Sequence, residues 1–199
     1  VMARSPTARH AFNWAFQTVP QPGLNGRRGY QPRGKVLGGS SSINAMIYTR
    51  GVPEDYDAWA AQGNPGWGWA DVLPVFKAAE HNERGSDAFH GTGGPLNVMD
   101  LCDPNPFSHA FVEAGVQAGQ VHNRDFNGAT QEGVGLYQVT HKGGERFSAA
   151  KAYLAPNRAR PNLHVVTGAH ATRVLLEHGR AVGVAYVKDG CEHTVRAER

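Results

Sequence analysis

The chain has 199 residues, a length that suits one domain or one and a half. Its 20 Lys and Arg residues exceed its 17 Asp and Glu residues by only 20 − 17 = 3, a charge too mild to favour nucleic acid as a partner. The 40% hydrophobic content exceeds that of disordered chains, two cysteines exclude a disulfide scaffold, and no apolar run approaches the ~18 residues of a membrane span.

Residues 1–33 are predicted to be irregular, because prolines and glycines interrupt them too often for a helix. Within this stretch Phe12, Trp14 and Phe16 alternate, which predicts a short extended piece lying on a core. In residues 34–50 a glycine pair and a serine triplet precede an apolar run. This order predicts a loop that enters a buried helix or a buried extended segment.

Two helices are expected next, at 53–61 and at 69–80. Pro53 fixes φ at the start of the first helix, and the acidic residues behind it face the positive end of the helix dipole. The second helix is indicated by apolar residues at helical spacing. Beyond it lies a loop-rich stretch with one short strand candidate at 95–98. A third helix is expected at 106–118, again from its apolar spacing.

The spacing of apolar residues changes from helical to alternating at Val134. A strand is predicted from there to Thr140, and a short helix from Ser148, its N-cap, to Leu154, where Pro156 ends it. Glycine-containing turns, the second an Asp-Gly pair, join the last three strands into an antiparallel meander with one polar and one apolar face. The further strands are predicted at 163–167, 171–177, 181–187 and 191–197.

The stretch 34–47 gives the clearest chemical signal. Its glycines allow the backbone to approach a ligand closely, and N–H groups at the start of a helix bind phosphate oxygens. The serine hydroxyls add donors, the apolar side chains that follow suit a flat conjugated ring, and Asn44 supplies the single amide among them. This combination indicates a dinucleotide ligand. A Gly/Ser turn before a buried helix explains it equally well, so the residues alone leave both interpretations open.

Other candidate binding sites in the sequence have weaker support. Residues 29–35 begin like a phosphate-binding P-loop, but Val36 replaces the required Ser or Thr and Pro32 removes a backbone donor. The ten histidines include no HExxH pair, so no metal site is predicted. Solvated positions are expected for His81, His90, His122 and His178, and partly buried ones for His141, His164 and His170.

Residues 33–48 resemble the first signature of the glucose–methanol–choline (GMC) family of flavin oxidoreductases. They read Arg-Gly-Lys-Val-Leu-Gly-Gly-Ser-Ser-Ser-Ile-Asn-Ala-Met-Ile-Tyr. The resemblance covers nearly the whole chain and is specific for the family, while it says little about the substrate. Stretches similar to the bacterial choline-dehydrogenase-like branch follow at 51–59, 64–69 and 71–74, and further matches to the family lie at 146–154 and 180–184.

The resemblance implies an α/β fold, α+β in this segment, that combines part of an FAD/NAD(P)-binding-type domain with part of a substrate domain. It assigns 1–83 to a loop and lid of the FAD domain, 84–160 to a partial substrate domain, and 161–199 to a meander of the FAD domain. It also implies a middle segment. A GxGxxG unit is expected before Val1, a second signature after Arg199, and the catalytic His further along the protein.

The activity implied by the resemblance is oxidation of a small-molecule alcohol to an aldehyde, with hydride transfer to N5 of FAD. Some family members attach the flavin through a His just before the Asn of the motif. Here Ile43 takes that place, so a non-covalent flavin is expected. The residues implied to contact FAD are Val36, Leu37, Gly38, Gly39, Ser40, Ser41, Asn44, Ala45, Met46 and Ile47, together with Ala171, whose backbone would read the adenine.

Two classes of function are carried forward. The first is a segment of an FAD-dependent alcohol oxidoreductase that is inactive alone, because no catalytic residue is assigned within the chain. The second is a non-catalytic binding or structural module derived from the same fold. The protein is expected to be cytoplasmic, or peripheral to the inner membrane. The length of its apolar runs predicts no membrane span, and its mild charge predicts no nucleic-acid partner. The resemblance does not indicate an oligomeric state.

Overall fold

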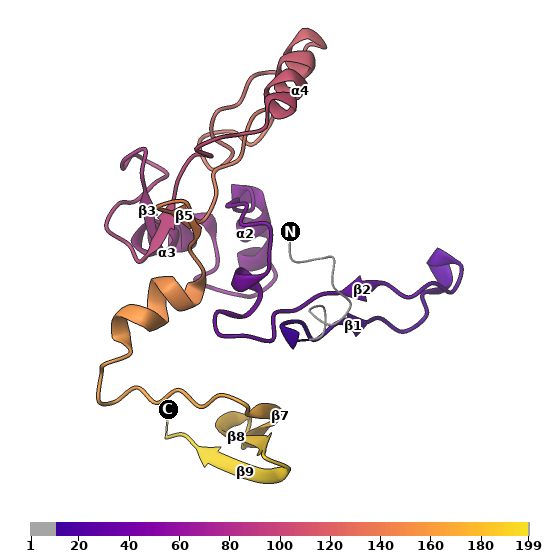
Figure 1. The fold of residues 1–199 in the computed structure, drawn as a ribbon, viewed down its shortest axis with the longest axis vertical. Coiled ribbons are helices and arrows are strands. Elements are labelled where there is room, and N and C mark those ends of the chain that lie inside the picture. The colour runs from indigo at the N-terminus through magenta and orange to yellow at the C-terminus, as the bar shows by residue number, and fades with distance from the viewer. Residues whose placement is uncertain (1–10, 199) are drawn as a thin grey trace. The chain divides into compact units, whose positions relative to one another are not determined.

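The computed structural model describes residues 11–198 and divides into two compact units, one ending at Asn157 and the other beginning at Arg158 (Figure 1). Irregular backbone over 1–10, part of the expectation for the N-terminal stretch, lies outside the described residues. The division into parts of an FAD domain and a substrate domain stays a prediction. None of the helices in the described part of the chain has the length and apolar character needed to cross a membrane.

The chain opens with a β-hairpin made of β1 (Phe16–Gln17) and β2 (Tyr30–Gln31), with a short 3-10 helix, η1 (Pro22–Leu24), near its tip (Figure 1). The rings of Trp14 and Phe16 stack with their centroids 6.0 Å apart. The predicted extended piece is confirmed only at Phe16, since Phe12 and Trp14 lie outside the strand and Ala15 has a φ of 52°. Its predicted burial is wrong, because about half of the Phe16 surface is exposed.

Helices α2 (Pro53–Ala61) and α3 (Trp69–Ala79) form where they were predicted. Asp57 Oδ1 accepts a hydrogen bond of 2.8 Å from the Trp69 backbone N–H, which satisfies an N–H group at the start of α3 from a side chain of α2. The ring of Tyr56 packs against Trp69 and Phe76 at 5.5 and 5.7 Å between centroids. An aromatic cluster thus joins the two helices.

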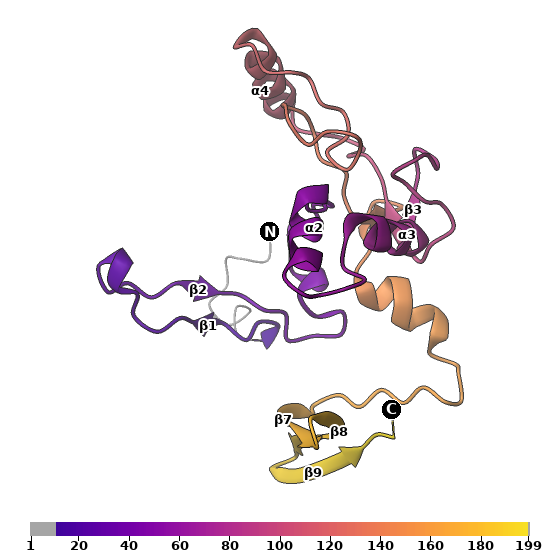
Figure 2. The ribbon, with the colours of Figure 1, turned by 180° about the vertical axis from the view of Figure 1, so that it is seen from behind.

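The chain leaves α3 directly into β3 (Glu80–Asn82), which pairs in parallel with β4 (Leu96–Val98). Figure 2 shows α3 and β3 together from behind. The strand candidate at 95–98 is confirmed, but the helix predicted to reach Glu80 ends one residue earlier, where the backbone becomes extended. Val98 is fully buried.

Helix α4 (Pro106–Gln117) confirms the third predicted helix. Asn105 caps it by accepting a 2.9 Å hydrogen bond from the Phe107 N–H. The strand predicted over 134–140 is wrong: Val134 and Val139 form only isolated bridges there. The apolar alternation makes this backbone extended, but no continuous partner lies beside it.

The first unit ends with a short hairpin of β5 (His141–Lys142) and β6 (Glu145–Arg146), followed by two helical turns. These are a π-helix, η3 (Ala150–Leu154), and a 3-10 helix, η4 (Ala155–Asn157), in place of the predicted short helix. Ser148 Oγ accepts from the Lys151 N–H at 3.4 Å, in keeping with its predicted capping role. Pro156 lies inside η4 and does not end the helical backbone.

The second unit contains an antiparallel sheet in the order β7 (His170–Glu177), β8 (Arg180–Lys188), β9 (Cys191–Arg196). In both turns the two central residues have positive φ: 50° and 78° at 178–179, 51° and 80° at 189–190. This is the backbone of type I′ hairpin turns. The strand predicted at 163–167 does not form. His164 and His170 are exposed, contrary to the prediction, whereas His141 in the first unit is half-buried as expected.

Candidate functional site

Residues 36–47, named the signature loop below, form neither the predicted buried helix nor the predicted buried extended segment. Their regular structure is one 3-10 turn, η2 (Gly39–Ser42), and the apolar residues on both sides of it face solvent. Val36, Leu37 and Ile47 are 41%, 42% and 51% exposed. The loop therefore presents an apolar ribbon at the surface of the first unit.

The two adjacent glycines of the loop both have positive φ, but they meet different surroundings. At Gly38 (φ 86°) an added Cβ would lie 2.6 Å from Ser42 Oγ and 3.1 Å from the Ala150 nitrogen. At Gly39 (φ 55°) it would meet nothing within 4 Å. Gly38 is thus required for internal packing. Gly39 leaves bare backbone against open space, which fits the close approach of a flat or phosphate-bearing ligand.

Residues 146–150 fix the signature loop by hydrogen bonds. Arg146 Nη1 donates to the Ser41 carbonyl oxygen and to Asn44 Oδ1, each at 3.0 Å. The Ala149 N–H donates to Ser41 Oγ at 2.9 Å. These bonds join positions more than a hundred residues apart in the chain, so the shape of the loop depends on 146–150.

Met46 lies at the far end of the loop in a left-handed conformation, with φ at 65°. Its N–H donates to Asn44 Oδ1 at 3.0 Å, and its carbonyl oxygen accepts from the Thr140 N–H at 2.9 Å. Its sulfur is 3.0 Å from Nε2 of His141. Side chains with a Cβ rarely adopt this backbone, and such strain persists only where the surroundings impose it.

All the residues implied to contact FAD except one lie in this loop. Ala171 belongs to the second unit, where it pairs with Tyr186 between β7 and β8. A register shift separates Ala171 from Arg173 in the same ladder. The peptide groups of Ala171 thus lie at an irregular point of an edge strand.

A second cluster of polar side chains is buried in the first unit. Arg50 Nη2 and Glu80 Oε2 are 2.9 Å apart, with side-chain exposures of 2% and 0%. Arg50 also donates from Nη1 to the Phe89 carbonyl oxygen at 2.7 Å. Asn82 and Gln138 exchange two side-chain hydrogen bonds of 2.9 and 3.1 Å. The parallel pair β3–β4 therefore places a charged and hydrogen-bonded core where apolar side chains would be expected.

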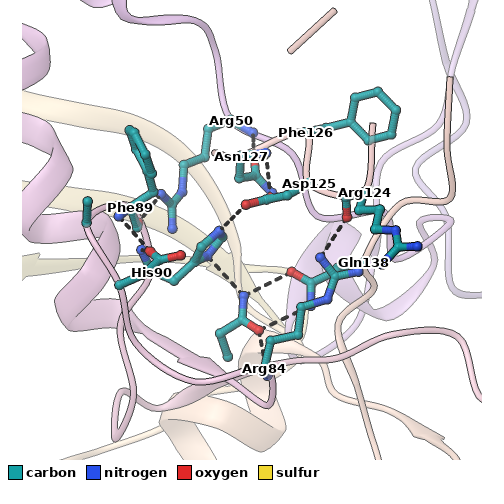
Figure 3. A network of polar contacts seen from close by, with 12 residues as sticks. Arg50, Arg84, Phe89, His90, Arg124, Asp125, Phe126, Asn127 and Gln138 are labelled. Atoms are coloured by element: carbon teal, nitrogen blue, oxygen red, sulfur yellow. Dashed lines mark hydrogen bonds and ion pairs between the residues drawn. The ribbon is translucent and has the colours of Figure 1, made fainter. Parts of the chain in front are cut away.

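His90 is at the centre of this network and is only 4% exposed, so its predicted solvation is wrong. Its Nδ1 is 3.0 Å from Glu80 Oε1 and its Nε2 is 2.9 Å from Asp125 Oδ2. Figure 3 shows His90 and Asp125 facing each other, with Arg50 and Asn127 close by. Asn82 Nδ2 lies 3.0 Å from Nδ1 of His90, because both nitrogens approach Oε1 of Glu80.

The network shifts the pKa values of its members in opposite directions. Burial alone would raise the pKa of Glu80, but hydrogen bonds from His90 and the Gly91 N–H and the charge of Arg50 together outweigh it and lower that pKa. The pKa of His90 is raised, chiefly by its hydrogen bond to Glu80. Burial opposes this rise, and the bond to Asp125 supports it. Glu80 is therefore favoured as a carboxylate and His90 as an imidazolium.

Asp87, His90 and Asp125 bring oxygen and nitrogen atoms within 4.8 Å of one another. Hydrogen bonds account for this grouping. His90 Nε2 is bonded to Asp125, and Asp87 Oδ1 accepts from the backbone N–H of His90 at 2.7 Å. We assign no metal to these residues.

A cavity of about 400 Å³ adjoins the network. Residues 50–54 and Trp69 line one part of it, and residues 126–132 line the rest. Gln131 Nε2 donates to the carbonyl oxygens of Arg50 and Phe126 at 2.8 and 3.1 Å, which ties the two walls together.

Sequence reasoning missed the anchoring role of Arg146 and the whole buried network. The Arg146 stretch was recognised as a match to the family, and that match was the available signal for a role beside the loop. The network gave no such signal. Its members are scattered from Arg50 to Gln138, and polar residues in loop-like surroundings are usually solvated.

Comparison with known proteins adds the last evidence. A sequence model described as "GMC oxidoreductase" matches residues 7–199. An alcohol dehydrogenase [acceptor] from Pseudomonas putida is 54% identical over 93% of this chain and 34% of its own length. An oxygen-dependent choline dehydrogenase from Sinorhizobium medicae is 47% identical over 98% of this chain and 35% of its own. The chain thus spans about a third of the length of the curated relatives it matches.

Among solved structures, pyridoxine 4-oxidase from Mesorbium loti superposes with a TM-score of 0.86 at 36% identity. The match covers 94% of this chain and 38% of that one. A mixed arrangement of helices and sheets like that of this oxidase is therefore shown for nearly the whole chain.

Proposed function

The chain belongs to the GMC oxidoreductase family, and from that premise we propose that its signature loop forms part of an FAD site in an enzyme that oxidises an alcohol to an aldehyde. The bound FAD would supply the hydride acceptor for this oxidation. The observation that carries the proposal is Gly39, which holds bare backbone in a left-handed conformation toward open space.

The residues of the loop have separate roles in this proposal. Positions 36–41 would contact the diphosphate and ribityl parts of the cofactor, and the absence of a side chain at Gly39 would let the main chain come close. Positions 44–47 lie beside the ring, and Met46 is fixed there by Asn44 and Thr140. The adenine contact of Ala171, which lies in the second unit, stays a prediction from the family resemblance. Ile43 stands where some family members carry the His that attaches the flavin, so a non-covalent cofactor is proposed.

The rigidity of the loop supports this assignment. Arg146 and Ala149 fix Ser41 by hydrogen bonds from within the chain, which restricts the conformations open to the loop. A preformed site loses less entropy when the ligand binds. The main chain of the loop positions the cofactor, and the rest of the cofactor's contacts come from other parts of the protein.

The substrate class in this proposal is a small alcohol, in keeping with relatives named for alcohol and for choline. The chain supplies cofactor contacts and no assigned catalytic base, so residues 1–199 alone would bind FAD weakly but saturably and would not oxidise alcohols. The sheet β7–β9 would belong to the FAD domain and 84–160 to the substrate domain. The protein would be cytoplasmic, or peripheral to the inner membrane.

Titration with FAD tests the proposal, with flavin fluorescence anisotropy as the readout. Gly39→Ala is expected to weaken saturable binding about tenfold, because the new Cβ occupies the space offered to the cofactor. Gly26→Ala is the matched control: Gly26 also has positive φ (73°) and open surroundings, but lies outside the loop. Equal affinities for the two variants, or no saturable binding by the unsubstituted chain, would contradict the proposal.

A further inference from the structure

His90 is held between two carboxylates that it contacts through different ring nitrogens. Nδ1 lies 3.0 Å from Glu80, and Nε2 lies 2.9 Å from Asp125. Only an imidazolium donates from both nitrogens, whereas a neutral ring keeps one N–H and turns a lone pair toward the other carboxylate. The two distances fit the protonated ring, which the raised pKa of His90 also favours, and removal of one proton must break one of the two bonds.

The two carboxylates differ in what else holds them. Glu80 is completely buried and also accepts from Arg50 Nη2 and from the Gly91 N–H. The Asp125 side chain is 29% exposed. Since a buried carboxylate that loses a donor has no water to replace it, the bond to Glu80 is the more costly one to break. The bond to Asp125 is the one that a neutral His90 gives up.

Asp125 belongs to a loop, residues 123–131, that closes onto the backbone of Arg50. Asp125 Oδ1 accepts from the Asn127 N–H at 3.0 Å, and Asn127 Oδ1 accepts from the Arg50 N–H at 2.7 Å. Gln131 donates to the Arg50 carbonyl oxygen at 2.8 Å. The same loop supplies one wall of the cavity of about 400 Å³ described above. A change at Asp125 is thus passed on to Arg50 and to the cavity.

We propose that His90 is a pH-operated latch: its imidazolium holds the 123–131 loop closed on Arg50, and loss of its proton frees Asp125 and opens the loop and the cavity behind it. The bond that breaks is the one between Nε2 and Asp125 Oδ2. Nδ1 keeps its proton and its bond to Glu80. The proton leaves to solvent, and the freed Asp125 carboxylate turns to water.

The charged groups around His90 set the direction of this switch. Glu80 and Asn82 face it from β3, Asp125 from the 123–131 loop, and Asp87 from the turn that carries His90 itself. Arg50 reaches the cluster through Glu80, and Lys77 Nζ binds the Asp87 carbonyl oxygen at 2.6 Å. The hydrogen bonds that His90 donates to Glu80 and to Asp125 together outweigh burial and raise the pKa of His90 above its ordinary 6.5. The loop is therefore closed at pH values below this raised pKa and opens as pH rises through it.

Amide hydrogen exchange in the full chain, read at the backbone N–H groups of Arg50 and Asn127, tests this latch. After correction for the intrinsic base-catalysed rate, protection of both amides is expected to fall about tenfold or more as pH rises through the titration of His90, followed by its ring nitrogen resonances. Amides of α2 serve as the internal reference. His109→Gln, at an exposed position on α4, is the matched control and should retain the full pH response.

Two variants separate the latch from a merely structural histidine. His90→Gln should show protection of Arg50 and Asn127 that no longer changes with pH. Asp125→Asn leaves Glu80, Arg50 and His90 in place and should give low protection already below the pH at which His90 titrates, again without a pH response. Constant protection in the unsubstituted chain across the titration of His90, a His90 whose pKa is not raised above its ordinary 6.5, or a pH response that survives in Asp125→Asn would each overturn the proposal.

Discussion

Arg50 and Glu80 form an ion pair of 2.9 Å whose two side chains are almost completely withdrawn from water. Each partner has further contacts. Glu80 accepts from His90 and from the Gly91 N–H, and the Arg50 guanidinium lies 5.2 Å from the ring centre of Phe76. Such a pair adds little net stability over an apolar pair of the same volume, because both charges lose hydration. Removal of one partner lowers the free energy of unfolding much more, because the other charge stays buried without its partner.

Glu80→Gln is expected to lower the free energy of unfolding by about 3–5 kcal/mol, since it leaves the Arg50 charge buried without a counter-charge. Urea unfolding followed by circular dichroism measures this change. Asp100→Asn is the matched control, because the Arg84–Asp100 pair is 39% and 57% exposed. Its loss should stay within about 1 kcal/mol. Equal losses for the two variants would show that burial does not govern the strength of the pair.

Arg146→Met is expected to loosen the signature loop, because it removes the donors to Ser41 and Asn44. Hydrogen exchange at the Met46 amide, which donates to Asn44 Oδ1, should accelerate about tenfold. Arg146→Lys should give an intermediate rate, since an ammonium group keeps the charge but lacks the planar fork of donors. An unchanged rate in Arg146→Met would mean that the loop keeps its shape without this side chain.

Substitution of the adjacent glycines Gly38 and Gly39 by alanine is expected to lower the free energy of unfolding by different amounts. Gly38→Ala places a Cβ against Ser42 and Ala150 in a left-handed backbone, so a loss of about 2 kcal/mol or more is expected. Gly39→Ala has the backbone strain alone and should lose about 1 kcal/mol. Thermal unfolding of the two variants compares them. The prediction fails if Gly39→Ala is the less stable of the two.

The buried network also predicts how stability depends on pH. The pKa of His90 is raised in the folded chain, so its contribution is fully present below its ordinary 6.5 and is lost as pH rises through the folded value. The pKa of Glu80 is lowered, so its contribution is present above its ordinary 4.5 and is lost as pH falls through the folded value. The free energy of unfolding, measured with urea at a series of pH values, should therefore be greatest between the ordinary pKa values of Glu80 and His90.

Single substitutions identify the group behind each side of this maximum. His90→Gln should remove the loss of stability at rising pH and leave the loss of stability at falling pH unchanged. Glu80→Gln should reduce both pH-dependent losses of stability. It removes the group that titrates at low pH, and it removes the main hydrogen-bond partner of His90. An alkaline side that persists in His90→Gln would assign that part of the profile to another residue.

Local patterns in the sequence predicted the elements whose formation depends on neighbours in the chain. Helices α2, α3 and α4 follow from apolar spacing and from prolines or caps at their starts. The turns at 178–179 and 189–190 follow from glycines at positions where φ must be positive. Each of these signals lies within a few residues of the structure it specifies.

Features that depend on distant partners could not be predicted in the same way. Strand β3 carries Glu, His and Asn, which do not favour a strand, and it forms because β4 pairs with it in parallel. The apolar alternation near Val139 predicted a strand, but pairing requires a continuous partner, and only single bridges form. The burial of His90 depends on Glu80 and Asp125, which come from two other parts of the chain.

The two margins of the sheet in the second unit differ in how readily they accept another strand. The ladder of β7 with β8 shifts register after Ala171 and again after Leu175, whereas β9 pairs with β8 without a shift. Bulges twist a strand out of line and discourage edge-to-edge pairing between molecules. Charged side chains on β9, such as Glu192 and Arg196, oppose the same pairing at the regular margin. Fibre-like association of this sheet is thus hindered by shape on one side and by charge on the other.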